Sequence, residues 1–468
     1  MPGNMPKKVI HNQDIVDEIL DDKAFRKDLL YHEEYKSFFL WQGGWYKILS
    51  YDEFKATVMR MIKIRFPEKN CTQNLANDVV EHIRLICPYR TKRTSFQYIA
   101  LKDQLLNTTT FELSPHDRTK TVLHHLPYTW QEIADTPTPQ FQRFLETSLV
   151  TKKDHTEPDI PLITVAQEMY GYFLIGNMKN TVAWFLVGDG SNGKSVMLYT
   201  IEKMLGSDFC TAMSIQELTT DKFAPSSLVG KRINISNEEE SKYMESSKFK
   251  ALVTGDPIRG ERKFQEGFTF RPQVKYVFAT NAMPKFKGIN YGLTRRMMIL
   301  PFHRRFTKRE CDYELTDKLV KELPGIVRFA VEGAKRLIGN HYQYTESLNI
   351  EASEKELMEE MSSSLLFFNE RFEISKEAFM ESKMLYAMYA EWTREVGKQA
   401  LSLYNFQREL RLNIPGLEHM RQMVDGKRLH GYNVSYKQDP EADKYLLEQI
   451  QNAQSQDSLS FGSGEDIQ

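Results

Sequence analysis

The chain has 468 residues, of which 41% are hydrophobic and 12% aromatic, so it is long enough for roughly two to four domains with sizeable cores. Its net charge of −1 argues neither for nor against nucleic acid, and the lack of a long apolar run excludes a membrane span. The four widely separated cysteines lack zinc-ligand spacing, and the charged start without an apolar stretch predicts a cytoplasmic protein.

Charge is distributed unevenly along the chain. From Ile258 to Lys308 there are twelve Lys or Arg against two Asp or Glu, a local charge of +10. From Asp439 to Gln468 there are seven acids against one lysine, a local charge of −6. The near-neutral total therefore hides a basic middle segment and an acidic end, and the polar tail is predicted to be disordered.

The first 135 residues mix helical and strand patterns. The stretch KSFFLWQGGWYKILSY predicts two short strands around Gly43-Gly44. We interpret Trp41 and Trp45 as core residues of this hairpin, with a stacking platform for nucleic acid as the alternative. The region is predicted to be an α+β domain, and its pattern leaves its role open.

From about residue 136 to 340, helical segments alternate with short apolar strands. The clearest strands are WFLVG, RINIS and KYVFAT, which predict a parallel sheet in a three-layer α/β module. Further on, MLYAMYAEWTREVG and LYNFQRELRL predict two helices, followed by a basic hairpin around Asp425-Gly426. Two helices and a β-ribbon are the outline of a winged helix.

The stretch GDGSNGKS fits the pattern G-x-x-x-x-G-K-[ST] between an apolar strand and an amphipathic helix. Glycines let backbone N–H groups converge on phosphate oxygens, and the helix presents its positive N-terminus. Lys194 is expected to bind the β- and γ-phosphates of ATP, and Ser195 to bind Mg²⁺. The predicted nucleotide site comprises Gly188, Asp189, Gly190, Ser191, Asn192, Gly193, Lys194 and Ser195.

Side chains at the ends of later strands complete the predicted catalytic set. Glu238 and Glu239 follow the strand RINIS, where a carboxylate can activate the attacking water, and Glu238 is our first choice for the base. Asn281 follows KYVFAT and is expected to contact the γ-phosphate or the water. Arg295 and Arg296 precede an apolar strand, and one of them is expected to act on a neighbouring subunit's nucleotide. The alternatives are an acidic surface turn for the glutamates, a turn-forming residue for Asn281, and surface arginines or a contact to a DNA phosphate for Arg295 and Arg296.

The order of these motifs resembles that of superfamily 3 helicases, and more closely the helicase half of phage, plasmid and poxvirus primase-helicases. The resemblance is carried by GDGSNGKS, LVGKRINISNEEE, KALVTGDPIRGERKFQEGFTFRP, and KYVFATNAMPKF followed by GLTRRMMILPF. It covers roughly residues 35–437, and is strongest in the segment with these motifs. The overall size is similar to that of replication initiator helicases of staphylococcal pathogenicity islands.

The resemblance implies a hexameric ring of AAA+ modules (P-loop NTPases) with ATP between subunits. Lys194, Glu238 and Asn281 would come from one subunit and an arginine from the next, while DNA passes through the centre and unwinding runs 3′ to 5′. The predicted fold class is α/β, with a three-layer AAA+ core between an N-terminal α+β domain and a C-terminal winged helix. The predicted divisions are 1–135, the motor at 136–345, the winged helix at 346–440, and the acidic tail at 441–468.

Two departures from the family pattern stand out. Many relatives carry an acid just before the catalytic glutamate, whereas this chain has Asn237, which can orient a metal-bound water but brings no charge. The predicted metal site is therefore Ser195, Asn237 and Glu238. Second, only about 135 residues precede the motor, and they lack a paired-aspartate motif for two metals, so we do not expect primer synthesis.

Basic residues in two regions are expected to contact DNA. IRGERKFQEGFTFRP predicts a hairpin that, in the family, projects into the ring; it offers Arg259, Arg262 and Lys263 to phosphates, with Phe264 for stacking. The winged helix offers Arg408 and Arg411 on its second helix and Lys427 and Arg428 in its ribbon. The alternatives are a solvated basic hairpin and a domain used for ring contacts.

We therefore expect an ATP-driven replicative DNA helicase that is also the replication initiator of a phage-like mobile element. Its partners would be single-stranded and forked DNA, origin duplex, other subunits of a homo-hexamer and host replication proteins, with no membrane. The first alternative is an ATP-switched origin-binding initiator that recruits a separate helicase. A protein remodeller is the second, against which the basic hairpin argues.

Overall fold

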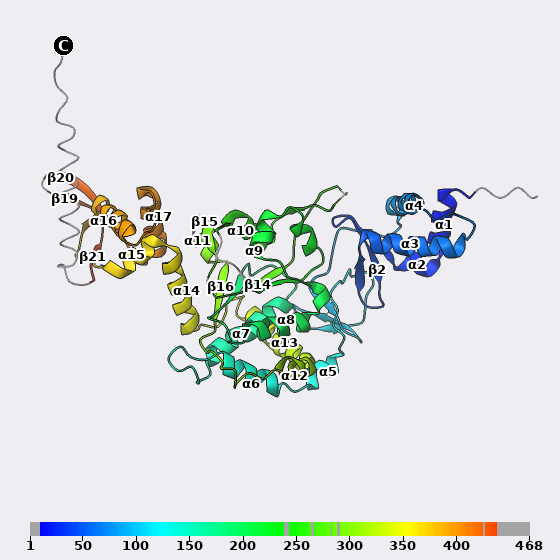
Figure 1. Ribbon diagram of the computed structural model, residues 1–468, viewed down its shortest axis with the longest axis horizontal. Helices are drawn as coiled ribbons and strands as arrows, with labels where there is room; N and C mark the ends of the chain where they lie inside the picture. Colours follow the sequence, from blue (N-terminus) through cyan, green and yellow to red (C-terminus); the bar gives the residue numbers. More distant parts are fainter. Residues whose placement is uncertain are drawn as a thin grey trace, which may run out of the picture. The chain divides into compact units, whose positions relative to one another are not determined.

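The computed structural model describes residues 10–237, 243–263, 266–281, 283–287, 291–424 and 426–437. The chain divides into two compact units, and most of their helices and some of their strands are labelled in Figure 1. The first unit consists of Met1–Pro284 and Arg296–Ile350, and the second of Lys285–Arg295 and Glu351–Gln468.

The first unit opens with a small α+β region. Its elements are α1 (Asn12–Asp21), α2 (Lys23–Asp28), β1 (Leu29–His32), β2 (Ser37–Trp41), β3 (Tyr46–Leu49), α3 (Tyr51–Arg65), α4 (Gln73–Ile86) and β4 (Arg90–Thr91). The strands pair in the order β3-β2-β1-β4, antiparallel except for β1 with β4. The β2–β3 hairpin confirms the strands predicted around Gly43-Gly44, and Gly43 supplies the positive φ of 90° in the turn.

Local sequence signals explain why α3 begins where it does. Ser50 and Glu53 form a capping box, in which Ser50 Oγ accepts from the Glu53 N–H at 3.2 Å and the Ser50 N–H donates to the Glu53 carboxylate at 2.8 Å. Apolar residues four apart, Phe54, Val58 and Ile62, then face the core of this region. Trp45 is half-buried and packs against a small apolar cluster, and its two predicted roles, core residue and stacking platform, stay predictions.

A connecting region leads to the central sheet. It comprises β5 (Tyr98–Ala100), β6 (Leu105–Asn107), β7 (Leu113–Ser114), α5 (Trp130–Asp135), α6 (Pro139–Ser148) and α7 (Ile160–Leu174). β5, β6 and β7 form an antiparallel meander. Glu322 satisfies N–H groups at the N-terminus of α6: its carboxylate accepts hydrogen bonds from the backbone N–H groups of Gln140 and Phe141 at 3.0 and 2.9 Å.

The centre of the first unit is a parallel sheet in the order β16-β8-β14-β10-β9. Its strands are β8 (Ala183–Val187), β9 (Cys210–Thr211), β10 (Ile233–Ser236), β14 (Lys275–Thr280) and β16 (Met297–Pro301). Every residue of β10 and β14 is buried, including the polar Asn234 and the charged Lys275 among their apolar residues. The three predicted strands are thus confirmed, and β8 lies between β16 and β14.

Helices cover both faces of this sheet, so the α/β class and its three layers are confirmed (Figure 1). The elements between and after the strands are α8 (Lys194–Leu205), η1 (Ser207–Phe209), α9 (Ile215–Thr220), η2 (Ala224–Leu228), β11 (Tyr243–Glu245), α10 (Ser246–Thr254), β12 (Ile258–Gly260), β13 (Phe268–Phe270), α12 (Leu315–Lys321) and α13 (Leu323–Gly339). Side chains alternate along β8: Trp184 joins the core under α7, α8 and α13, whereas Phe185 packs near Phe249 of α10.

The second unit has its own core. It contains β15 (Lys285–Lys287), α11 (Tyr291–Thr294), most of α14 (Leu348–Met361), α15 (Ser363–Arg371), β17 (Phe372–Ile374), β18 (Met380–Glu381), α16 (Ser382–Glu395), α17 (Leu403–Asn413), β19 (His419–Val424), β20 (Lys427–Tyr432) and β21 (Val434–Tyr436). Phe367, Tyr389 and Phe406 meet in its core, where the rings of Tyr389 and Phe406 stack 4.4 Å apart. The two predicted helices and the ribbon after them are confirmed, and the name winged helix stays a prediction.

Both sides of residue 135 belong to the first unit, and the division after Ile350 falls close to the predicted end of the motor. The four-part domain scheme stays a prediction, and the tail at 441–468 lies outside the described residues. Within the described ranges, no helix is long and apolar enough to cross a membrane.

Candidate functional site

The glycine-rich loop follows β8 at the carboxyl edge of the central sheet, where loops of parallel strands converge. Gly190 and Gly193 have φ of 91° and 96°, and Ser191 between them also has a positive φ of 48°. This left-handed backbone reverses the chain so that α8 begins at Lys194 with its N-terminus at the loop. Ser195 is exposed at that N-terminus.

Lys194 is the most constrained side chain of the loop. It is 7% exposed, and its ammonium donates to the carbonyl of Gly188, to Asn192 Oδ1 at 3.3 Å and to Asn281 Oδ1 at 3.2 Å. Asn281 comes directly after β14, the strand beside β8. The structure therefore brings together two residues that the sequence assigned to one site.

Helix α6 packs closely against the glycine-rich loop. A Cβ on Gly193 would lie 2.8 Å from Ser148 Oγ and 3.0 Å from the ring of Phe144, both on α6. Ser148 Oγ and Asn192 Nδ2 are buried and have no hydrogen-bond partner within the described part of the chain. An incoming polar group can satisfy such atoms, so the loop fits an anion such as phosphate.

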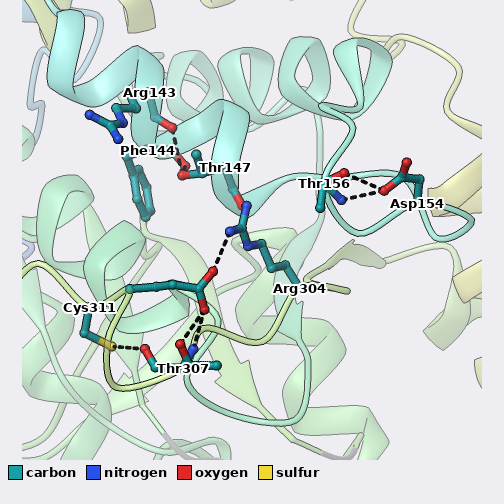
Figure 2. Close-up of polar contacts among 9 residues, drawn as sticks. Arg143, Phe144, Thr147, Asp154, Thr156, Arg304, Thr307 and Cys311 are labelled. Carbon is teal, nitrogen blue, oxygen red and sulfur yellow. Dashed lines mark hydrogen bonds and ion pairs between the residues drawn. The ribbon is translucent and has the colours of Figure 1, made fainter.

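A segment after β16 closes over the same loop, and the sequence analysis did not identify it. The Phe306 N–H donates to the Ser191 carbonyl at 2.7 Å. Arg304 donates to the Thr147 carbonyl of α6 at 3.5 Å and pairs with Glu310 at 2.9 Å (Figure 2). The run HRRFTKR after the last strand was the available signal, but its basic character does not indicate which residue turns inward.

Glu310 holds this segment in a local turn. Its carboxylate accepts from the Thr307 hydroxyl at 2.7 Å and from the Thr307 N–H at 2.8 Å (Figure 2). These hydrogen bonds, with a further contribution from Arg304, lower the pKa of Glu310 to about 2. The carboxylate is therefore charged at neutral pH and keeps Arg304 directed between the turn and α6.

The end of β10 carries the predicted base and metal ligands. Asn237 is exposed just after the strand, and β10 pairs with β14, so it lies at the same sheet edge as Asn281. Glu238 and Glu239 lie outside the described residues. No metal-ligating cluster of histidines, cysteines and acids occurs among the residues that are described. The roles of Asn237, Glu238 and Glu239 stay predictions.

The two candidate finger arginines differ in their surroundings. Arg296, in the first unit, is half-buried, and its Nε donates to Thr254 Oγ1 at the end of α10 at 3.1 Å. Arg295 belongs to the second unit and is exposed. A side chain that must reach another subunit needs exposure, so these environments favour Arg295.

The predicted basic hairpin is present as the antiparallel pair of β12 and β13. Arg259 is exposed and lies 3.3 Å from Glu261, and Lys263 is exposed beyond it. Arg262 is half-buried, and its guanidinium lies over the Phe268 ring at 4.6 Å. Arg262 is therefore the least available of the three for phosphates, and Phe264 lies outside the described residues.

In the second unit, the predicted DNA-contacting residues lie on two elements. Arg408 and Arg411 are exposed on α17, and Lys427 and Arg428 are exposed on β20. Arg408 lies over the Tyr404 ring at 5.7 Å, and Arg411 donates to the Gln407 carbonyl within its own helix. These contacts leave the charges at the surface, and their role in binding DNA stays a prediction.

Two family models match separate parts of the chain. Residues 186–296, which contain the glycine-rich loop and Asn281, match a family of unknown function, DUF5906. Residues 18–150, which contain the N-terminal sheet and α6, match the family described as D5 N terminal like. Each match covers less than half of the chain, and together they include the loop and the helix that packs on it.

Two curated viral proteins are similar to part of the chain. One, from Acanthamoeba polyphaga mimivirus, is named "Putative helicase L207/L206" and is 27% identical over 174 residues, which are 36% of this chain and 18% of that protein. The other, from Invertebrate iridescent virus 3, is named "Putative helicase 121R" and is 26% identical over 171 residues, 31% of this chain and 18% of that protein. The chain spans less than a fifth of the length of either relative.

Among solved structures, the apo form of the NrS-1 C-terminal region is similar over 90% of this chain and 98% of its own length. The identity is 11% and the TM-score is 0.47. At this score the likeness is remote and supports no functional assignment.

Proposed function

We propose that the chain is an ATP-dependent DNA helicase of the superfamily 3, AAA+ type that acts in replication. The observation that carries this proposal is the meeting of Lys194 and Asn281 at a glycine-rich loop on a buried parallel sheet. The two viral relatives named helicases and the D5 N-terminal-like region support the same class.

The chemistry follows from the residues at the loop. Backbone N–H groups at the start of α8 and the Lys194 ammonium would bind the β- and γ-phosphates of ATP. Asn281 would donate to the γ-phosphoryl oxygens, while Glu238 would orient and deprotonate the attacking water. Ser195, Asn237 and Glu238 would hold Mg²⁺, which neutralises phosphate charge when bound.

A complete site needs a cation from a neighbouring subunit, and we propose Arg295 for that role. The proposal is supported by the exposure of Arg295 and by the hydrogen bond that keeps Arg296 on Thr254. A guanidinium supplied in trans couples hydrolysis in one subunit to the position of the next. This arrangement implies a ring, for which we propose a homo-hexamer.

The cargo is proposed to be a DNA strand held by the β12–β13 hairpin. Arg259 and Lys263 are exposed there and would contact phosphates, which carry no sequence information and so suit a translocating motor. By family resemblance, translocation runs 3′ to 5′. The arginines on α17 and the basic β20 are proposed to bind origin duplex, which would make the protein an initiator in a mobile element.

A strand-displacement assay tests the proposal directly. The purified chain, ATP and Mg²⁺ are mixed with forks that carry only a 3′ tail or only a 5′ tail. We expect displacement from the 3′-tailed fork and none with Lys194→Ala. If neither fork is unwound at any nucleotide concentration, although the protein is folded, the helicase proposal is wrong.

The second candidate is an origin-binding initiator that uses ATP as a switch and recruits a separate helicase. The exposed arginines of α17 and the basic strand β20 favour duplex binding by the second unit. This candidate predicts ATP hydrolysis and sequence-specific duplex binding without strand displacement.

A further inference from the structure

A large cleft lies in the first unit between its N-terminal region and the β12–β13 hairpin. Its volume is about 1590 Å³, which exceeds the range of roughly 300–1,000 Å³ typical of small-molecule sites. The walls come from β2, β3 and α3 on one side, and from η1, the turn before β10, and residues of the β12–β13 hairpin on the other. The size points to a segment of a polymer.

Direct contacts fix the two walls against each other. The Arg271 N–H donates to the Glu34 carboxylate at 3.1 Å, and the rings of Tyr35 and Phe270 meet edge to face at 6.0 Å. At another point, the end of the Ile48 side chain from β3 packs on Gly230 in the turn before β10, where a Cβ would lie 2.1 Å from Ile48 Cδ1. The cleft is therefore built by packing between the two regions.

The charges lining the cleft favour a polyanion. Seven cations line it, namely Lys36, Lys47, Lys55, Arg84, Lys231, Arg262 and Lys263, against five acids, Asp52, Glu53, Glu81, Asp208 and Glu266. Two of these cations pair with two of the acids, Lys47 with Glu53 at 3.0 Å and Arg84 with Glu81 at 2.7 Å. Five cations then remain against three acids, and four of the five are lysines, the fifth being the half-buried Arg262.

The side chain of Trp45 also lines this cleft. Trp45 stacks face to face on His125, with ring centroids 3.8 Å apart and planes 12° apart, and both residues line the cleft. A half-buried indole in a cleft that lysines also line is a combination that suits single-stranded nucleic acid, because bases stack on aromatic rings while cations contact the backbone.

We propose that this cleft binds the single DNA strand that the hairpin handles. The exposed Lys263 of the hairpin lines the cleft, so a strand held there continues onto the predicted pore contact. The inference rests on the proposed helicase function and assigns the N-terminal region a role in it. Phosphates of the strand lie against Lys36, Lys55 and Lys231, and a base stacks at Trp45.

Salt dependence of binding tests the cleft separately from the motor. Affinity of the full chain for a labelled oligothymidylate is measured by fluorescence anisotropy over a range of salt, without nucleotide. Lys55→Gln should weaken binding and lower the slope of log K against log salt by about 0.7, the contribution of one single-strand phosphate contact. Lys63→Gln on the exposed side of the same helix is the matched control and should change neither.

A second variant and two competitors sharpen the outcome. The double substitution Lys36→Gln with Lys55→Gln should lower the slope by about 1.4, twice the single effect. An oligouridylate should compete with the labelled strand, and a blunt duplex of equal length should not. If wild-type protein unwinds forks but Lys55→Gln and Lys63→Gln bind the strand alike, the cleft proposal is wrong and the helicase stands. A wild type that neither binds nor unwinds contradicts both.

Discussion

The ammonium of Lys194 lies 3.2 Å from the side-chain oxygen of Asn281, although the two residues are 87 positions apart in the chain. Lys194 is the first residue of α8, and Asn281 directly follows the neighbouring strand β14. The amide group of Asn281 thus lies with its oxygen toward the lysine, which leaves its Nδ2 donors for another acceptor. Under the proposed function, a γ-phosphoryl oxygen bound by Lys194 would be such an acceptor.

Asn281→Ala should lower kcat for ATP hydrolysis on the order of 10²-fold, the usual cost of one donor to a developing charge. KM should change much less, because Lys194 and the loop still bind the nucleotide. Asn281→Asp keeps an acceptor for Lys194 but loses the donor, and should be as impaired as the alanine variant. Steady-state hydrolysis measures both, and an active aspartate variant would show that the donor is not needed.

Gly190 and Gly193 form a matched pair, because both have positive φ but only one is crowded. Alanine at either position bears a left-handed backbone cost of roughly 1–2 kcal/mol. At Gly193 it also overlaps Ser148 and Phe144, whereas Gly190 has open space around its Cα. Gly193→Ala should therefore weaken binding of a fluorescent ATP analogue by more than Gly190→Ala. Equal losses in the two variants would contradict the role of α6 in shaping the loop.

Substitutions of Arg304 and Arg305 test whether the segment after β16 supports the glycine-rich loop. Arg304 bridges Thr147 and Glu310, and the segment donates to the loop through the Phe306 N–H. Arg304→Ala loses both contacts and should weaken nucleotide binding about fivefold, equivalent to about 1 kcal/mol, because neither contact touches the loop directly. Arg305→Ala, on the exposed neighbour, should bind as wild type does. Similar affinities for the two variants, measured by titration calorimetry, would show that the bridge does not support the site.

Subunit mixing tests the trans arginine. If Arg295 completes the site of a neighbour, Arg295→Ala and Glu238→Ala subunits are each inactive, but a mixed ring contains some sites with both residues intact. We expect partial recovery of ATP hydrolysis at intermediate mixing ratios. Mixing Arg296→Ala with Glu238→Ala serves as the comparison, since Arg296 contacts Thr254 in its own subunit. An absence of recovery at every ratio would remove Arg295 from this role.

The sequence predicted the parts of the site that follow from local pattern. The loop, the strands and the position of Asn281 were accessible because apolar strands of a parallel sheet end at a common edge. Ser148 and Arg304 were not, because they reach the loop through packing of α6 and of the segment after β16, and no periodic pattern encodes such contacts. The half-buried Arg262 is a further example: its charge indicated DNA, whereas its contact with Phe268 depends on the fold of the hairpin.

Lys275 is another residue whose surroundings the sequence pattern did not predict: its strand was predicted, but its burial as a charged group was not. It is 2% exposed at the start of β14, where its ammonium donates to the Asn177 carbonyl and lies 4.2 Å from the centre of the Tyr172 ring. Burial, with a further contribution from the charge of Arg232, lowers the pKa of Lys275 from 10.5 to about 7. The folded protein therefore disfavours the protonated lysine.

This pKa fixes the sign of a pH effect on stability. Between about pH 7 and 10.5 the unfolded chain holds the Lys275 proton and the folded chain releases it, so this residue makes the free energy of unfolding rise with pH. The slope from one such proton approaches about 1.4 kcal/mol per pH unit. Urea denaturation at pH 7, 8 and 9 should show a steeper rise for wild type than for Lys275→Met.

Lys179→Met controls for the loss of a lysine in the same region, because Lys179 is exposed, with its ammonium 5.5 Å from the centre of the Tyr342 ring. The free energy of unfolding of Lys179→Met should rise with pH with the same slope as that of wild type. Loss of the hydrogen bond to the Asn177 carbonyl lowers the free energy of unfolding of Lys275→Met by the same amount at every pH. The test is therefore the slope of the free energy of unfolding against pH, and not its absolute value. Cysteines and tyrosines that titrate in this range are shared by all three proteins and cancel in the comparison. Parallel curves for wild type and Lys275→Met from pH 7 to 9 would mean that the buried lysine keeps its ordinary pKa, with its charge stabilised by the Asn177 carbonyl and the Tyr172 ring.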